Sequence, residues 1–257
     1  MDTNNEYGTL YSQKRLLELL KEFHAFCQDN GVVYSLAAGS LLGAIRHNGF
    51  IPWDDDLDVF VDRPNYNKIV GLLSNHTSLM VERDSVESLW VDRVRRKIEI
   101  GKGNYIPTLD LLVIDNVPNG IFKRKIKLFV IMSLQGMMKK KVNLSKGTVV
   151  YRIGSIVTFV LGKFFPNRLK KKWYRRISQI GNKTTSDFVS NYNGAFADIS
   201  RLYPSSMMNN IVLHQFEDMQ ACVVVDWDTC LKTHFGDYMT LPKEEDRKPQ
   251  HGGKCEL

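Results

Sequence analysis

The spacing of apolar residues predicts a mixture of helices and strands over the first 116 residues. Apolar side chains recur at helical spacing through 12–30, and Gly31 is placed to end that helix. The apolar run 32–38 predicts a buried strand, and a second helix is expected over 39–47. The other elements expected here are a strand after a turn at Ile51, a helix at 66–73, and strands at 79–83, 90–100 and 108–114. This order indicates a mixed α/β sheet domain.

The segment from Ile121 to Ser186 has a different pattern. Two apolar stretches, 126–138 and 148–165, are expected to be helical, and neither offers the roughly 20 uninterrupted apolar residues of a membrane-spanning helix. The segment holds 17 Lys and Arg and no Asp or Glu, whereas the rest of the chain has 18 basic and 28 acidic residues. Basic, apolar helices of this kind favour an anionic membrane surface. The alternative is a helical subdomain that packs its apolar stripe on the sheet and exposes a basic face.

Composition narrows the class of protein further. The 257 residues are 43% hydrophobic, which is typical of a soluble globular chain with a real core. The N-terminal 15 residues lack the apolar stretch of a secretory signal, and the four cysteines have no zinc-ligand spacing, so we expect reduced thiols in the cytoplasm. Aromatic residues do not interleave the basic ones in a base-stacking pattern, so nucleic acid is not an expected partner. A strand at 221–227 and a helix at 229–235 are expected near the C-terminus.

Candidate chemistry concentrates in WDDDLD, at 53–58, where four aspartates occupy five positions. On a strand Asp54, Asp56 and Asp58 would share one face, and Asp55 would point the other way as a solvated or capping residue. Carboxylates this close need a cation, and their oxygens suit Mg²⁺ or Mn²⁺. Asp110, inside the apolar run TLDLLV, is the expected third ligand because an unpaired charge there is costly. The alternative for such a triple-Asp sequence is a solvated turn or a helix cap.

A phosphate-binding helix start lies upstream of these aspartates. Gly39 and Ser40 open the second helix, where exposed backbone N–H groups bind anions and glycine permits close approach. A helix start, paired carboxylates and a third acid together favour metal-dependent phosphoryl or nucleotidyl transfer. The basic residues expected to contact the substrate phosphates are Arg46, His47, Arg95 and Lys97. For any one of these taken alone, plain surface solvation is the competing interpretation.

Three stretches of the chain resemble a known family. AAGSLLGAIRHNGFIPWDDDLDVFVDRPNY closely resembles the LicD signature, TLDLLVIDNVP resembles the later acidic strand of that family, and FGDYMTLPKEEDRKPQH resembles its C-terminal tail. The likeness covers roughly 12–116 and 196–251. It implies an α+β, nucleotidyltransferase-like fold of the polymerase-beta type, with a mixed sheet flanked by helices. The domains expected on this basis are a catalytic core at 1–120, a basic helical insert at 121–190, and a completing part at 191–257.

The resemblance also implies an activity. LicD proteins transfer a phospho-alcohol, such as phosphocholine or glycerol- or ribitol-phosphate, from a CDP-activated donor such as CDP-choline to a glycan hydroxyl, with release of CMP. The acceptor would belong to a capsule polysaccharide, teichoic acid or lipopolysaccharide, or to a lipid-linked oligosaccharide precursor. The enzyme is then expected to be peripheral, at the cytoplasmic face of the membrane. Two features depart from the family: the zinc-binding cysteines of its fukutin-related branch and a fuller proline-rich tail are both missing.

Carried over by position, the resemblance assigns roles to particular residues. Asp56, Asp58 and Asp110 would bind two Mg²⁺ or Mn²⁺ ions, with Asp54 as a further or neighbouring ligand. Gly39 and Ser40 would hold the phosphates, and His251 in the tail would close over the site. Trp53 could contribute to an aromatic cage for a choline group, or simply pack in the core. Two rival functions are a nucleotidyltransferase that moves NMP from an NTP, and a catalytically silent scaffold of a glycan-assembly complex.

Overall fold

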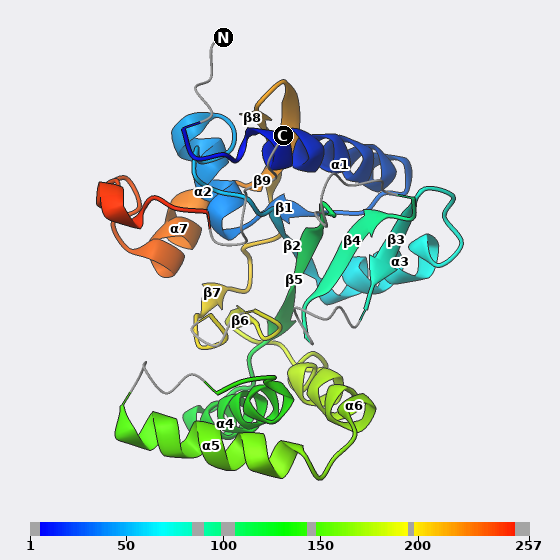
Figure 1. Ribbon diagram of the computed structural model, residues 1–257. Coiled ribbons are helices and arrows are strands. Elements are labelled where there is room, and N and C mark those ends of the chain that lie inside the picture. Colours follow the sequence, from blue (N-terminus) through cyan, green and yellow to red (C-terminus); the bar gives the residue numbers. More distant parts are fainter. Residues whose placement is uncertain (1–5, 84–89, 99–105, 143–147, 195–197, 250–257) are drawn as a thin grey trace. The chain divides into compact units, whose positions relative to one another are not determined.

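The computed structural model describes residues 6–83, 90–98, 106–142, 148–194 and 198–249. The chain divides into two compact units (Figure 1). Unit 1 comprises 1–83, 92–113 and 206–257, and unit 2 comprises 84–91 and 114–205. Unit 2 therefore contains the whole of the predicted helical insert 121–190, together with the residues that flank it.

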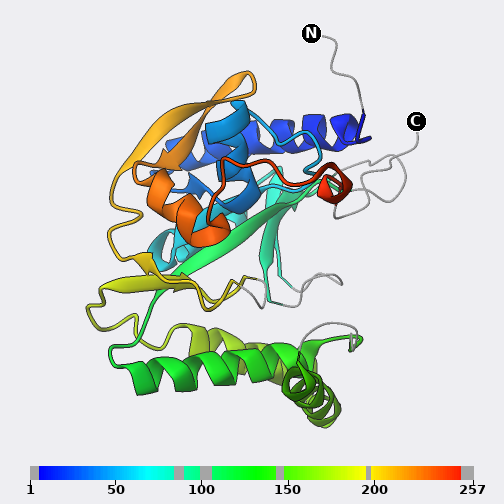
Figure 2. The ribbon, with the colours of Figure 1, turned by 90° about the vertical axis from the view of Figure 1, so that its left-hand side faces the viewer.

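Unit 1 is a mixed α+β structure, as the sequence predicts. Its strands follow the order β1-β2-β5-β4-β3, and a separate hairpin joins β8 to β9. The strand bounds are Ser35–Leu36 for β1, Asp58–Asp62 for β2, Leu79–Glu82 for β3, Asp92–Arg96 for β4, Leu109–Asn116 for β5, Ile211–Phe216 for β8 and Met219–Val224 for β9. The helices are α1 at Leu10–Asp29, α2 at Ala38–His47, α3 at Arg63–Leu73 and α7 at Trp227–Phe235, with a short 3₁₀ turn at Glu244–Asp246. Figures 1 and 2 agree that α1 lies along one end of the sheet.

The boundaries in unit 1 follow from backbone chemistry. Gly31 has a φ of 56° just beyond α1, and Asn48 has a φ of 54° just beyond α2, so the left-handed region follows both helices, and Gly31 ends α1 as predicted. The predicted strand 32–38 is wrong in extent, because only Ser35–Leu36 pairs with β2. The N–H of Val33 donates instead to the Asn65 side chain at 2.9 Å, which removes it from any ladder.

Unit 2 is mainly helical. Its helices are α4 at Ile121–Met138, α5 at Val149–Gly162 and α6 at Asn167–Ser178, and its short strands are β6 at Phe188–Asn191 and β7 at Tyr203–Pro204. Helices α4 and α5 cross steeply: α5 lies across the view in Figure 1, and α4 does so after the quarter turn to Figure 2. The last three residues of β5 pair with β6 in this unit.

The core of unit 2 contains a buried lysine. The apolar part of this core includes Ile131, Leu134 and Tyr174. Lys127, only 3% exposed, donates from Nζ to the carbonyls of Asn116 and Ile180, at 3.2 and 2.7 Å. These bonds satisfy a charge that would otherwise be costly to bury. Among the residues that the structure covers, no helix combines the length and the apolar character needed to cross a membrane.

Candidate functional site

The loop after α2 turns back and lies along that helix. A Cβ atom on Gly39 would come within 3.0 Å of the Asp54 carboxylate, closer than real Cβ atoms approach a neighbour. From α1, the Gln13 side-chain amide donates hydrogen bonds to the carbonyls of Ile51 and Asp54, at 3.0 and 2.9 Å. The glycine on α2 and the Gln13 amide on α1 therefore hold Asp54, the first aspartate of the cluster, in place.

The aspartates at the end of this loop repel one another. Burial raises the pKa of Asp54 to about 9, and the charge of Asp56 and a hydrogen bond between the two carboxyl groups add to the rise. Burial also raises the pKa of Asp58 well above its usual range, and Asp56, Asp110 and Asp54 add repulsion in that order. All four carboxyl groups thus belong to one electrostatic cluster, which would be stabilised by a cation.

Strand β5 brings Asp110 into this cluster. The Asp110 N–H donates to the carbonyl of Leu57, directly before β2, at 2.8 Å. Arg93 on β4 stands opposite Asp110 in the ladder, and its Nε lies 2.7 Å from the Asp110 Oδ1. Arg93 also acts to lower the pKa of Asp58, although this effect is smaller than the effects that raise it. Arg93 is therefore a built-in counterion of the cluster.

The structure corrects one expectation about this stretch. Strand β2 begins only at Asp58, so the alternation expected from 54 onward does not apply to the irregular residues 54–57. Asp55 is 4% exposed, and the prediction that it is solvated is wrong. Ser40, at the start of α2, is buried and its hydroxyl accepts a hydrogen bond from the Asp58 N–H at 2.9 Å. Gly39 and Ser40 thus position aspartates, while their contact with phosphate remains a prediction.

A cationic and aromatic cluster lies at the other end of α2, roughly 12 Å along the helix from Gly39. Arg46 donates from Nε to the His47 ring at 3.0 Å and from a terminal nitrogen to the Tyr238 carbonyl at 2.8 Å. The Trp53 ring lies edge-on to His47, and the guanidinium of Arg247 lies 5.5 Å from the Trp53 centroid. Burial lowers the pKa of Arg46, with Arg247 adding to the effect, as expected for crowded positive charge. Such a cluster is suited to binding an anion.

The other predicted substrate contacts are less connected to these clusters. Arg95 makes an ion pair with Glu82 on β3, with its Nε 2.8 Å from Oε2. Lys97 is exposed at the end of β4. His251 lies outside the described residues. Contact between any of these residues and substrate remains a prediction.

The donor set of the acidic cluster fits a hard divalent cation. Four carboxylates offer the oxygen ligands that Mg²⁺ and Mn²⁺ prefer, and a cation would relieve the repulsion that raises the pKa values of Asp54 and Asp58. Within the described ranges, no three acidic, histidine or cysteine side chains are arranged as a ready coordination group. Asp110 is drawn to Arg93, so a cation would compete with Arg93 for that carboxylate.

Sequence reasoning missed two residues of the site. Arg93 lies on the same face of its strand as Arg95, but nothing in the sequence shows that it stands opposite Asp110. Arg247 belongs to the tail stretch that carries the family resemblance, yet its contact with Trp53 joins positions almost 200 residues apart. Both contacts depend on long-range pairing, which local patterns do not reveal.

Taken together, fold and site define a class: a mixed α+β protein with a crowded acidic centre and a cationic, aromatic cluster at opposite ends of one helix. Residues 31–101 match the family model described as LicD/FKTN/FKRP, nucleotidyltransferase domain. The chain therefore carries a LicD family domain. Asp54, Asp56, Asp58 and Arg93 lie inside the matched range, and Asp110 and Arg247 lie beyond it.

The chain is also similar to individual proteins. It is 29% identical to the lipopolysaccharide cholinephosphotransferase LicD of Haemophilus influenzae, over 91% of this chain and 92% of that protein. Over a shorter stretch, 17% of the chain, it is 48% identical to a Rickettsia prowazekii protein and to a Rickettsia typhi protein, neither with an assigned function. These stretches cover 16% and 14% of the two rickettsial proteins. The likeness to the Haemophilus protein thus spans both units.

Proposed function

We propose that this protein transfers a phospho-alcohol, such as phosphocholine, from a CDP-activated donor to a hydroxyl of lipopolysaccharide or another cell-surface glycan. The observation that carries the proposal is the similarity to a lipopolysaccharide cholinephosphotransferase along nearly the whole chain. The crowded carboxylates of Asp54, Asp56, Asp58 and Asp110 support it, because they could hold the cations that assist transfer from an anionic diphosphate donor. The description of the matched family model names a nucleotidyltransferase domain, which is compatible with a nucleotide-activated donor.

The acidic cluster has two tasks in this scheme. Asp54, Asp56, Asp58 and Asp110 would hold Mg²⁺ or Mn²⁺, two ions in the proposal, which when bound would offset the charge of the donor phosphates and acidify the acceptor hydroxyl. Asp110 accepts the proton of that hydroxyl at a carboxylate oxygen. The Arg93 guanidinium, 2.7 Å from Oδ1, keeps this carboxylate oriented. The Ser40 hydroxyl accepts a hydrogen bond from the Asp58 N–H, which fixes the start of β2 against the start of α2.

The bond changes are those of a single displacement. The acceptor oxygen forms a bond to the β-phosphorus of the donor, and the bond between that phosphorus and the bridging oxygen breaks. CMP leaves with the bridging oxygen, and the hydroxyl proton goes to Asp110. Arg46, His47 and Arg247 would bind an anionic group of the substrates at the other end of α2, and Trp53 offers a flat apolar surface for the donor's base or alcohol.

The test is a panel of donors with Mg²⁺ present. CDP-choline, CDP-ethanolamine, CDP-glycerol and CDP-ribitol are each incubated with protein and a glycan acceptor, and CMP is measured. Release of CMP from at least one donor is expected, together with its loss in Asp58→Asn. Asp29→Asn, an exposed aspartate at the end of α1, is the matched control and should remain active.

Two results would overturn the proposal. Pyrophosphate released from an NTP, with no CMP from any donor, would assign the chain to the nucleotidyltransferases that move NMP. No turnover of either donor class, together with no binding of Mg²⁺ in calorimetry, would favour the silent scaffold.

A further inference from the structure

Helix α5 buries its small and polar residues and exposes its large apolar ones, the opposite of an ordinary surface helix. The side that faces α4 carries small or polar residues: Ser155 is 7% exposed, and a Cβ on Gly162 would collide with the backbone of Met137. Thr158 fills the space beside Gly136 of α4. A soluble helix normally buries its large apolar residues. Here small residues instead allow a close helix crossing, and the large apolar residues are left on the outside.

The outer side of α5 is a continuous apolar stripe. Its members lie on one side of the helix and are all exposed: Val149, Ile153, Ile156, Val157, Val160 and Phe164. Phe164, just past the end of the helix, is 76% exposed. A contiguous apolar surface of this kind on a folded chain marks an interaction site. We call this set the α5 stripe.

Helix α4 extends the same surface. Phe122, Ile126 and Phe129 lie at helical spacing on the face of α4 that further along carries Gly136, where α5 crosses. All three are exposed, and Phe122 is 76% exposed. Helix α5 thus covers the C-terminal half of this α4 face, and the N-terminal half remains bare and apolar.

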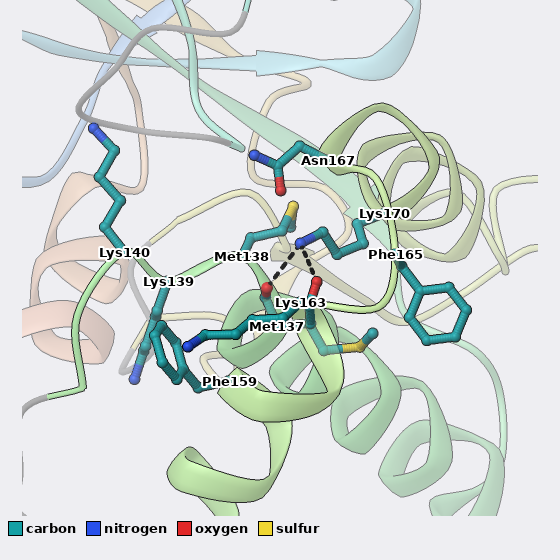
Figure 3. A pocket seen from close by; sticks show the side chains of 10 residues that line it. Met137, Met138, Lys139, Lys140, Phe159, Lys163, Phe165, Asn167 and Lys170 are labelled. Atoms are coloured by element: carbon teal, nitrogen blue, oxygen red, sulfur yellow. Dashed lines mark hydrogen bonds between the residues drawn. The ribbon is translucent and has the colours of Figure 1, made fainter.

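The segment that carries this surface is strongly basic. The chain carries no acidic residue from Ile121 to Ser186. Where α4, α5 and the start of α6 meet, lysines and apolar side chains line a hollow of about 450 Å³ (Figure 3). Lys170 is tied there to two backbone carbonyls, while Lys140 and Lys163 are exposed. The Lys163 ammonium lies 4.9 Å from the Phe159 ring centroid, so this exposed positive charge stands beside an apolar side chain.

We propose that the α5 stripe, with the bare half of α4, docks on an anionic lipid bilayer. Charge complementarity identifies the occupant: an apolar face flanked by exposed lysines, on a segment without acidic residues, matches acyl chains below a layer of phosphate headgroups. The apolar residues enter the boundary of the acyl region, and the phosphates meet Lys140 and Lys163 at the hollow. Helix α5, at 14 residues, is roughly 21 Å long, so it lies in the interface and does not cross it.

Vesicle flotation with the full-length protein tests this docking. We expect binding to vesicles of phosphatidylcholine mixed with phosphatidylglycerol at low salt, weaker binding at high salt, and little binding to phosphatidylcholine alone. Val157→Ser combined with Phe164→Ser should lower the partition coefficient about tenfold or more. Lys140→Gln combined with Lys163→Gln should lower it roughly 25-fold, because each lysine near the surface contributes about a fivefold effect.

The matched control removes apolar groups of similar exposure from unit 1. Val212→Ser with Leu213→Ser on β8 should bind vesicles as the wild type does. Circular dichroism checks that each variant is folded. If the Val157→Ser and Phe164→Ser double variant fails to fold, the double lysine variant still decides the test, because both lysine side chains are exposed.

Three outcomes would overturn the docking. The first is no binding of the wild type to the anionic vesicles, and the second is equal binding by the wild type and both unit 2 variants. The third is a wild-type dimer in light scattering that is lost in the α5 stripe variant, with no vesicle binding by either protein. The last outcome would assign the face to a second copy of the chain. Flotation requires no donor or acceptor, so its result does not depend on whether the protein releases CMP.

Discussion

Gly39→Ala is expected to separate activity from stability. The new Cβ would fall within 3.0 Å of an Asp54 carboxylate oxygen, so that carboxylate must move by roughly 1 Å to reach ordinary contact distance. Displacements of this size at a reacting centre cost about 100-fold in rate, or about 2.7 kcal/mol of barrier. The expected result is a loss of transfer of that order, measured as CMP release at saturating donor.

Stability should change little in the same variant. The obstructing group is a side chain that can rotate, and alanine is favoured over glycine in a helix by up to about 1 kcal/mol. For a chain of this size the melting temperature should therefore stay equal or rise by about 2 to 4 °C. Gly71→Ala on α3 is the matched control, because nothing lies within 4 Å of its added Cβ. It should gain similar stability and keep full activity.

Either of two results would refute this reasoning. Wild-type turnover in Gly39→Ala would show that the position of Asp54 does not matter for the chemistry. A melting temperature that falls by many degrees, while Gly71→Ala behaves as expected, would show that the contact between Gly39 and Asp54 supports the fold instead of placing the carboxylate.

Three further variants test other parts of the structure. Asp58→Asn removes a carboxyl whose raised pKa makes the folded state bind more protons than the unfolded one, so wild-type stability should fall as pH rises above about 4. With a chelator present, the melting temperature of the variant should exceed that of the wild type by more as the pH rises. Parallel pH profiles of the two proteins would contradict the raised pKa of Asp58. Lys127→Met leaves two carbonyls unsatisfied and should lower the free energy of unfolding by about 2 to 4 kcal/mol in a urea titration, whereas Lys125→Met, exposed on the same helix, should not. Arg247→Ala should raise the KM for the donor with stability changed by less than about 1 kcal/mol, and an unchanged KM would remove Arg247 from the binding surface.

The helices were the most predictable part of this fold. Glycine and asparagine in the left-handed region end α1 and α2 where the sequence indicates, because those residues tolerate positive φ best. Strands were less predictable. The run 32–38 is apolar enough for a strand, yet a side-chain acceptor from Asn65 takes the N–H of Val33. Tertiary contacts of this kind outweigh local preference.

The second strand of the C-terminal hairpin was predicted and the first was not. The predicted strand 221–227 is observed as β9, Met219–Val224, but its partner β8 has no strong local signature. The turn between them places Glu217 at a φ of 52° without the usual Asn-Gly pair, so the hairpin signal is missing from the sequence.

The acidic cluster was found from residue type and spacing alone, because burying adjacent carboxylates is costly and therefore informative. Its counterion was not. Arg93 faces Asp110 only because two strands pair in one register, and a shift of one residue would turn the guanidinium to the other face. Asp55 was misassigned for a related reason, since the chain follows an irregular path before β2 begins.

The return of the loop along α2 has a consequence for how the protein folds. Gly39 meets Asp54, and Ser40 meets the Asp58 backbone, over separations of fewer than 20 residues. Short loops close quickly and at small entropic cost, so these contacts have low contact order. Arg247 reaches Trp53 only after the chain has closed a loop ten times longer. The acidic end of the helix can therefore form early in folding, and the cationic end is completed last, when the tail arrives.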